Sequence, residues 1–123
     1  MNSGRTLGIA GILLALAMVL GAFGAHALKA ELSAERLQVY ETAVMYHFFN
    51  ALGLLGIGLT LRFVNSPAVR WAGVLVLIGI VLFSCSLYAL TFGAPRPIGI
   101  VTPFGGLALI AGWICYAAGV WRH

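Results

Sequence analysis

The residues of this chain that could do chemistry are a few polar side chains, most of them set in long apolar stretches. They comprise two histidines, one carboxylate, two tyrosines, an asparagine and a serine: His26, Tyr40, Glu41, His47, Asn50, Ser84 and Tyr88. Imidazole can bind a metal or haem or transfer a proton, and the other groups can hydrogen-bond a polar ligand. Polar groups at membrane depth are candidates for a functional site, and we call this set the polar cluster.

Most of the polar cluster shares one side of a helix if its segment is helical. Tyr40, His47 and Asn50 fall within one stripe, because residues seven and three apart lie on the same face. Glu41 follows Tyr40 directly and therefore points about 100° away from it. We expect the stripe to face other helices and Glu41 to lie outside it.

Four interpretations of the polar cluster are open. In the first, which we favour, histidines, tyrosines and Glu41 hydrogen-bond to one another and lock the first helix to the second. In the second, His26 and His47 bind a haem or a metal, although no further Cys/His spacing supports this. The third is a pocket for a lipid headgroup, a quinone or another small molecule. The fourth is the proton or ion path of a small transporter, but no acid lies deep in an apolar stretch.

No motif of a known reaction is present, so we predict no catalytic residue. The chain has no CxxC pair, nucleophile elbow, phosphate-binding loop or pair of carboxylates. Its two cysteines, Cys85 and Cys115, would differ in depth by about 12 Å in helices. That is too far for a disulfide.

The composition excludes most other classes of protein. Of the 123 residues 62% are hydrophobic and only 8% are charged, and the mean hydropathy is +1.04. A soluble domain has about 25% charged residues, and a disordered chain has low hydrophobicity. The net charge of +4 comes from scattered arginines rather than a basic stripe, so nucleic acid is not an expected partner. We conclude that this is an integral membrane protein.

Four apolar stretches predict a single transmembrane domain over residues 1–123. A spanning helix needs about 20 apolar residues, and lipid leaves the backbone no other way to satisfy its hydrogen bonds. We expect helices over residues 7–27, 34–61, 71–92 and 103–121. The first resembles a signal peptide with an Ala25-His26-Ala27 cleavage site, but it is longer than such an apolar region, of about 7–15 residues.

The expected helix ends carry capping signals. Ser33 is a candidate N-cap with Glu35 in the first turn. A helix from there to residue 61 is about 42 Å long, so its first turns should project beyond the membrane. Thr102-Pro103 is a second start signal, and it leaves residues 93–101 as an irregular connector.

Small residues predict how the helices pack. Gly105, Gly112 and Gly119 recur every seven residues, the pattern of a left-handed bundle seam. Gly21 occurs in small-xxx-small pairs with Ala17 and Ala25. We interpret these glycines as sites of packing within the chain, with a homo-oligomer interface as the alternative.

The arginines give a weak signal for orientation. Four spans place both termini on one side, together with four basic residues and no acid: Arg5, Arg62, Arg70 and Arg122. The other side carries three basic residues and all three acids. Because positive residues prefer the cytoplasm, we expect both termini to be cytoplasmic, with Trp71 and Trp121 at that membrane boundary.

Four strings in order carry a family resemblance. They are Gly21-Ala-Phe-Gly-Ala-His-Ala-Leu28, Tyr40-Glu-Thr-Ala-Val-Met-Tyr-His47, Phe83-Ser-Cys-Ser-Leu-Tyr88 and Thr102-Pro-Phe-Gly-Gly-Leu107, followed by Gly112-Trp113. With them the chain resembles the YgdD-like family of small bacterial membrane proteins, which has no established activity. Cys85 departs from the pattern, because a small residue such as glycine is expected at this position. The resemblance implies a four-helix protein of the bacterial inner (plasma) membrane, and no reaction.

Together these observations predict a non-enzymatic accessory or scaffold subunit. Its partners would be membrane lipids and a second copy or a larger membrane complex, and it would need no cofactor. The alternative is a binder of a lipid, quinone or haem-type ligand at the end that holds His26, Glu41 and His47. A small transporter is a third possibility.

Overall fold

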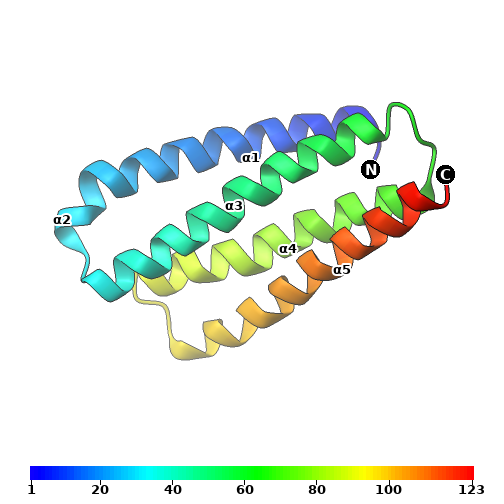
Figure 1. The fold of residues 1–123 in the computed structure, drawn as a ribbon. Coiled ribbons are helices and arrows are strands. Elements are labelled where there is room, and N and C mark those ends of the chain that lie inside the picture. The colour runs from blue at the N-terminus through cyan, green and yellow to red at the C-terminus, as the bar shows by residue number, and fades with distance from the viewer.

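A computed structural model describes all 123 residues and consists of helices with short connections. Four long helices run back and forth (Figure 1): α1 Ser3–Phe23, α3 Ala34–Thr60, α4 Pro67–Thr91 and α5 Val101–Trp121. With their short helical extensions, all four are long and apolar enough to cross a membrane. The prediction of an all-α protein with four spans is confirmed, and both termini lie at the same end (Figure 1).

The first and second spans meet at an irregular corner. After α1 the chain makes a π-helical turn, Gly24–Leu28, and a short helix, α2 Lys29–Glu31. The predicted end at residue 27 is therefore not a helix end, because the chain stays helical to Glu31. The start of α3 is as predicted, since Ser33 Oγ accepts a hydrogen bond of 3.2 Å from the amide of Arg36.

The starts of the other three helices differ from prediction. α1 begins at Ser3 rather than residue 7, because Asn2 caps the amide of Arg5. α4 begins four residues early, because Ser66 caps the amide of Val69 and Pro67 occupies the first turn. α5 follows directly on a 3₁₀ turn, Arg96–Ile100, so the expected connector is largely helical. The prediction that Thr102 caps this helix is wrong, because its hydroxyl hydrogen-bonds to Ser86 of α4 instead. Turning this corner requires a positive φ of 96° at Gly93, where glycine has no steric penalty.

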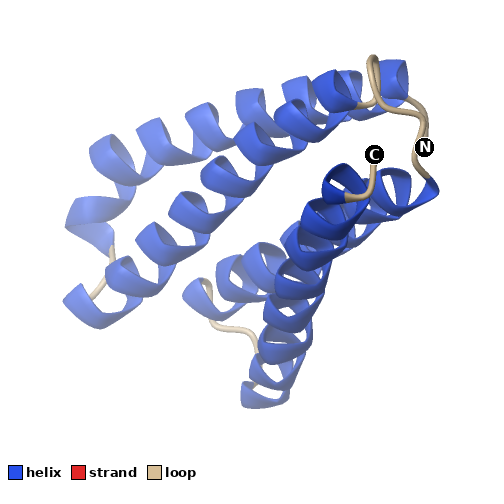
Figure 2. Ribbon diagram, turned by 45° about the vertical axis from the view of Figure 1, so that its right-hand side comes forward, coloured by secondary structure: helices blue, strands red, loops and turns tan.

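The helices pack in chain order. Extensive contacts join α1 to α3, α3 to α4 and α4 to α5, and Figure 2 shows two pairs of helices inclined to each other. The shared core lies where the pairs meet and is built from small and branched apolar residues: Ala10, Leu54, Ile57, Val69, Ala72, Val76, Ile80 and Leu109. α3 and α5 both pack against α4 and make few contacts with each other.

The glycines of α5 form the tightest contact of the fold. Gly105, Gly112 and Gly119 are buried against α4. A Cβ atom on Gly112 would lie 2.8 Å from Val76 Cγ2, and one on Gly119 would lie 2.9 Å from Val69 Cγ2. These glycines therefore pack against another helix of the same chain, as predicted, and their contacts recur every seven residues. Gly21 of α1 is looser, 3.6 Å from Val44 by the same measure.

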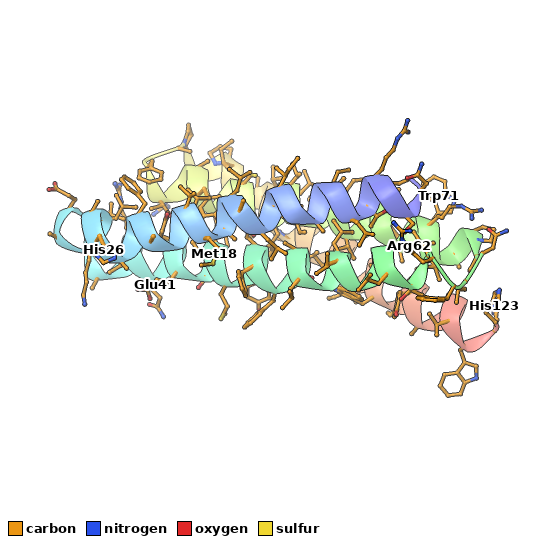
Figure 3. The ribbon with its side chains drawn as sticks, turned by 90° about the horizontal axis from the view of Figure 1, so that it is seen from above. Met18, His26, Glu41, Arg62, Trp71 and His123 are labelled. Carbon is orange, nitrogen blue, oxygen red and sulfur yellow. The ribbon has the colours of Figure 1, made fainter.

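The outer surface is that of a protein in lipid. Only 26 of the 123 residues are buried, and large apolar side chains are exposed on every long helix, among them Met18, Phe49, Ile78 and Ile110. Charged groups gather at the two ends. Figure 3 shows His26 and Glu41 toward one end and Arg62, Trp71 and His123 toward the other.

Candidate functional site

Polar side chains of α3 connect this helix to all three of its neighbours. The hydroxyl of Tyr40 donates to the carbonyl of Leu20 in α1. His47 Nδ1 and the Tyr88 hydroxyl of α4 lie 2.8 Å apart, and Trp113 of α5 donates to Asn50 over 2.9 Å. The polar stripe predicted on this helix therefore exists, and its groups lie at helix–helix contacts.

Tyr40 sits at the π-helical corner. Its ring is 1% exposed and lies directly on Gly24, where any Cβ atom would clash with it. The rings of Tyr88 and Phe92 pack against it with centroids 5.7 and 6.2 Å away. Because π-helical turns often mark functional positions, this corner is one candidate region.

His47 is buried between α3 and its neighbours. It is 4% exposed, and its Nε2 atom has no hydrogen-bond partner. Ser84 supports the same contact, because its hydroxyl donates to the carbonyl of Ala43 over 3.0 Å. Two separate hydrogen bonds therefore join α3 to α4: one between His47 and Tyr88, and one from Ser84 to the Ala43 carbonyl.

Asn50 is oriented by its two partners. Trp113 Nε1 can only donate, so it must face the amide oxygen of Asn50. The Asn50 nitrogen then donates to the carbonyl of Tyr46 over 2.9 Å. Trp113 reaches α3 because it lies on Gly53, where a Cβ atom would overlap the indole ring.

His26 and Glu41 do not join these contacts. Both are exposed. The two helices run antiparallel, and two contacts give their register: Tyr40 lies opposite Leu20, and His47 lies opposite the backbone of Leu13. His26 is thus thirteen residues from the position opposite His47, about 20 Å along the helix. The two histidines cannot ligate one haem or metal, because the antiparallel register separates them; no group of three or more His, Cys, Asp or Glu residues could hold a metal ion.

Two hollows adjoin the polar contacts. One, the Glu41 notch, lies between the π-helical corner and α3 and has a volume of about 220 Å³. Its lining residues are Gly21, Gly24, Ala25, Tyr40, Glu41, Val44 and Met45. The other, the α3–α5 groove, is larger, at about 560 Å³. Its lining residues are Tyr46, Asn50, Phe83, Gly106, Leu109, Ile110, Trp113 and Ile114.

Several residues of these sites were not predicted from the sequence. Trp113 and Phe83 form the groove, and the hydroxyls of Thr60 and Tyr116 lie 2.9 Å apart in a second link between α3 and α5. A signal for Trp113 exists. Its N–H needs an acceptor within the membrane. Asn50 is at a similar depth, because Asn50 and Trp113 lie at similar distances from the C-terminal ends of α3 and α5.

The fold and these contacts define a class: a small multi-pass membrane protein whose spanning helices are joined by polar side chains. A family model described as "Protein of unknown function (DUF423)" matches residues 20–106. The chain belongs to this family, whose model covers most of the polar contacts described above.

Similar proteins carry the same kind of description. "UPF0382 membrane protein YwdK" of Bacillus subtilis is 45% identical over 80% of this chain and 81% of its own length. "UPF0382 membrane protein SSP2132" of Staphylococcus saprophyticus is 44% identical over 87% and 88%. "UPF0382 inner membrane protein YgdD" of Escherichia coli is 36% identical over 85% and 80%. The resemblance seen in the sequence is thereby confirmed, and no solved structure matches the fold.

Proposed function

We propose that the protein is a non-enzymatic accessory or scaffold subunit of a membrane assembly. The observation that carries the proposal is that the polar groups within the membrane hydrogen-bond to neighbouring helices. Tyr40, His47, Ser84 and Asn50 bond to neighbouring helices. Groups engaged in this way stiffen a bundle, which supports a structural role for them.

The outer face of α1 supports contact with another membrane helix. Gly8 and Gly11 are exposed, and nothing lies within 4 Å of a Cβ atom placed on either. In lipid, helices associate through small residues that let their backbones approach. These two glycines have no packing role within the chain, which is consistent with a partner on this face.

Isolation from native membranes in a mild detergent tests the proposal. Native mass spectrometry should find the 13.0 kDa chain in a larger complex, and Gly8→Leu should dissociate it. Gly56→Leu is the matched control, because a Cβ atom there also meets nothing. A monomer without any partner protein, in membranes and in detergent alike, would refute the proposal.

The Glu41 notch favours a second candidate function, the binding of a lipid headgroup. An exposed carboxylate stands at the rim of a hollow lined by glycines and apolar side chains, which suits an amine-bearing headgroup. We expect phosphatidylethanolamine to be retained over phosphatidylglycerol in native mass spectra, and Glu41→Gln to abolish the preference. Glu35→Gln, exposed in the same region, is the control. No preference in the unmodified protein would exclude this candidate.

For location we propose the bacterial inner membrane with both termini in the cytoplasm. The support is the four arginines on the side of the termini and the exposed Trp71 and Trp121 at that end. A C-terminal reporter that is active only in the cytoplasm should be active on this chain. Activity of a periplasm-specific reporter instead would reverse the orientation.

A further inference from the structure

The α3–α5 groove contains hydrogen-bonding groups that the protein itself does not use. Asn50 accepts from Trp113 and donates to the Tyr46 carbonyl, which leaves one amide hydrogen and one lone pair free. The hydroxyl of Tyr46 makes no hydrogen bond within the chain, and its ring lies 4.9 Å from that of Phe83. Both residues line the groove.

The depth of Asn50 makes this surplus costly. It lies ten residues from the end of α3 at Thr60, about 15 Å at 1.5 Å per residue. That is the middle of a hydrocarbon layer about 30 Å thick. No water is available there, so an amide hydrogen facing lipid has no partner. A lipophilic molecule with an acceptor oxygen would supply one.

The shape of the groove selects a small molecule over a helix. Its α5 wall extends from Gly106 to Ile114, about 12 Å along the axis, whereas a docked helix would cross the whole membrane. The volume of about 560 Å³ is typical of sites for small molecules. Three of its lining side chains, Tyr46, Phe83 and Trp113, are aromatic, and aromatic surfaces pack well against flat rings.

We propose that the α3–α5 groove binds a lipophilic molecule of the quinone class. Its flat ring packs against the aromatic side chains, one carbonyl accepts the free amide hydrogen of Asn50, and its tail extends into lipid. Binding alone is proposed, without electron transfer. The inference goes beyond the proposed accessory role and does not depend on it.

A protein with Trp113 as its single tryptophan provides the test. Trp71 and Trp121 are 63% and 91% exposed, so Trp71→Phe and Trp121→Phe should leave the fold intact. In nanodiscs, a benzoquinone with a decyl tail should quench Trp113 fluorescence in a saturable manner. Decylbenzene has the same tail but no carbonyl, so it should fail to displace the bound quinone.

Variants of the groove decide between occupants. Gly106→Leu should weaken binding at least tenfold, because the added side chain extends from the groove wall. Asn50→Ala should weaken it about fivefold through the lost hydrogen bond. If Asn50→Ala misfolds, Gly106→Leu decides the test alone, because Gly106 lines the groove and its replacement removes no hydrogen bond of the protein. Gly56→Leu and Thr60→Ala, outside the groove, should bind normally.

Three results would overturn the proposal. Quenching that rises linearly and equally in all variants would mean that the quinone only partitions into lipid. Competition by decylbenzene would mean that the groove holds any apolar chain. A change of oligomeric mass in Gly106→Leu, with quinone affinity unchanged, would mean that the groove receives another helix.

Discussion

Two faces of α5 are fastened to their neighbours in opposite ways. Toward α4, glycines let the backbones touch, and a Cβ atom on Gly105 would collide with the backbone of Phe83. Toward α3, long aromatic side chains bridge a gap: Trp113 reaches Asn50, and Tyr116 reaches Thr60. The first contact has no room for a ligand, and the second borders a groove.

The difference follows from the physics of helix association in lipid. Without a hydrophobic force between helices, either close packing or hydrogen bonding must hold them together. Close packing uses many weak contacts and depends on shape. Hydrogen bonds act at single points and tolerate space between them. We therefore expect the glycine contact to dominate stability and the bridged contacts to contribute less.

The largest effect is expected for Gly105→Ala. The added methyl group would force α4 and α5 apart, at a cost of about 3 kcal/mol in the free energy of unfolding. Circular dichroism during equilibrium unfolding in mixed detergent micelles would measure it. Gly106→Ala is the matched control, because a Cβ atom there lies 3.7 Å from Phe83 Cδ2, an ordinary contact. Equal stabilities of the two variants would show that the close contact does not hold the helices.

A smaller loss is expected for Tyr88→Phe. His47 would lose its one hydrogen-bond partner while staying buried, which costs about 2 kcal/mol. Replacing both groups, in a His47→Leu/Tyr88→Phe variant, should recover part of that loss in the same unfolding assay. If the double variant is as unstable as the sum of the single changes, the two residues do not interact.

Tyr40→Phe should cost less, about 0.6 kcal/mol, the usual size of an interhelical hydrogen bond in a membrane. The Leu20 carbonyl keeps a second donor, the amide of Gly24, so no buried acceptor is orphaned. Unfolding measured beside Tyr88→Phe would check the order. A larger loss for Tyr40→Phe would indicate that the π-helical corner depends on this bond.

The smallest effect is expected for Thr60→Ala. Thr60 ends α3 beside the exposed Arg62, where the Tyr116 hydroxyl can turn to water. The loss should not exceed about 0.5 kcal/mol, and unfolding curves should nearly overlay those of the unmodified protein. A loss as large as that of Gly105→Ala would abolish the contrast between the two faces of α5.

Much of the fold could be predicted because its signals are local. The four spans depend on continuous apolar sequence, and the start of α3 depends on Ser33 and the amide three residues on. The start of α5 was missed for the opposite reason. Thr102 has the residue type of a cap, but its hydroxyl bonds to Ser86 of another helix, and a tertiary contact overrides the local preference.

The site could be predicted only as a set of residues. Tyr40 and His47 face neighbouring helices, as predicted from their shared face of α3. Glu41 lies outside this stripe, as its angle around the helix predicted. The grouping of His26 with His47 was wrong in geometry, because both were assigned to one end without the register between α1 and α3. Glu41 likewise takes no part in the hydrogen bonds expected of it.

The sequence by itself determined that this chain crosses the membrane four times and which residues are polar within it. Those properties depend on transfer into hydrocarbon and on periodicity within one helix. Only the tertiary structure decided which polar groups meet, that Trp113 pairs with Asn50, and that a groove stays open between α3 and α5. The rotation and register of each helix depend on many contacts with its neighbours at once, and no single segment of sequence contains them.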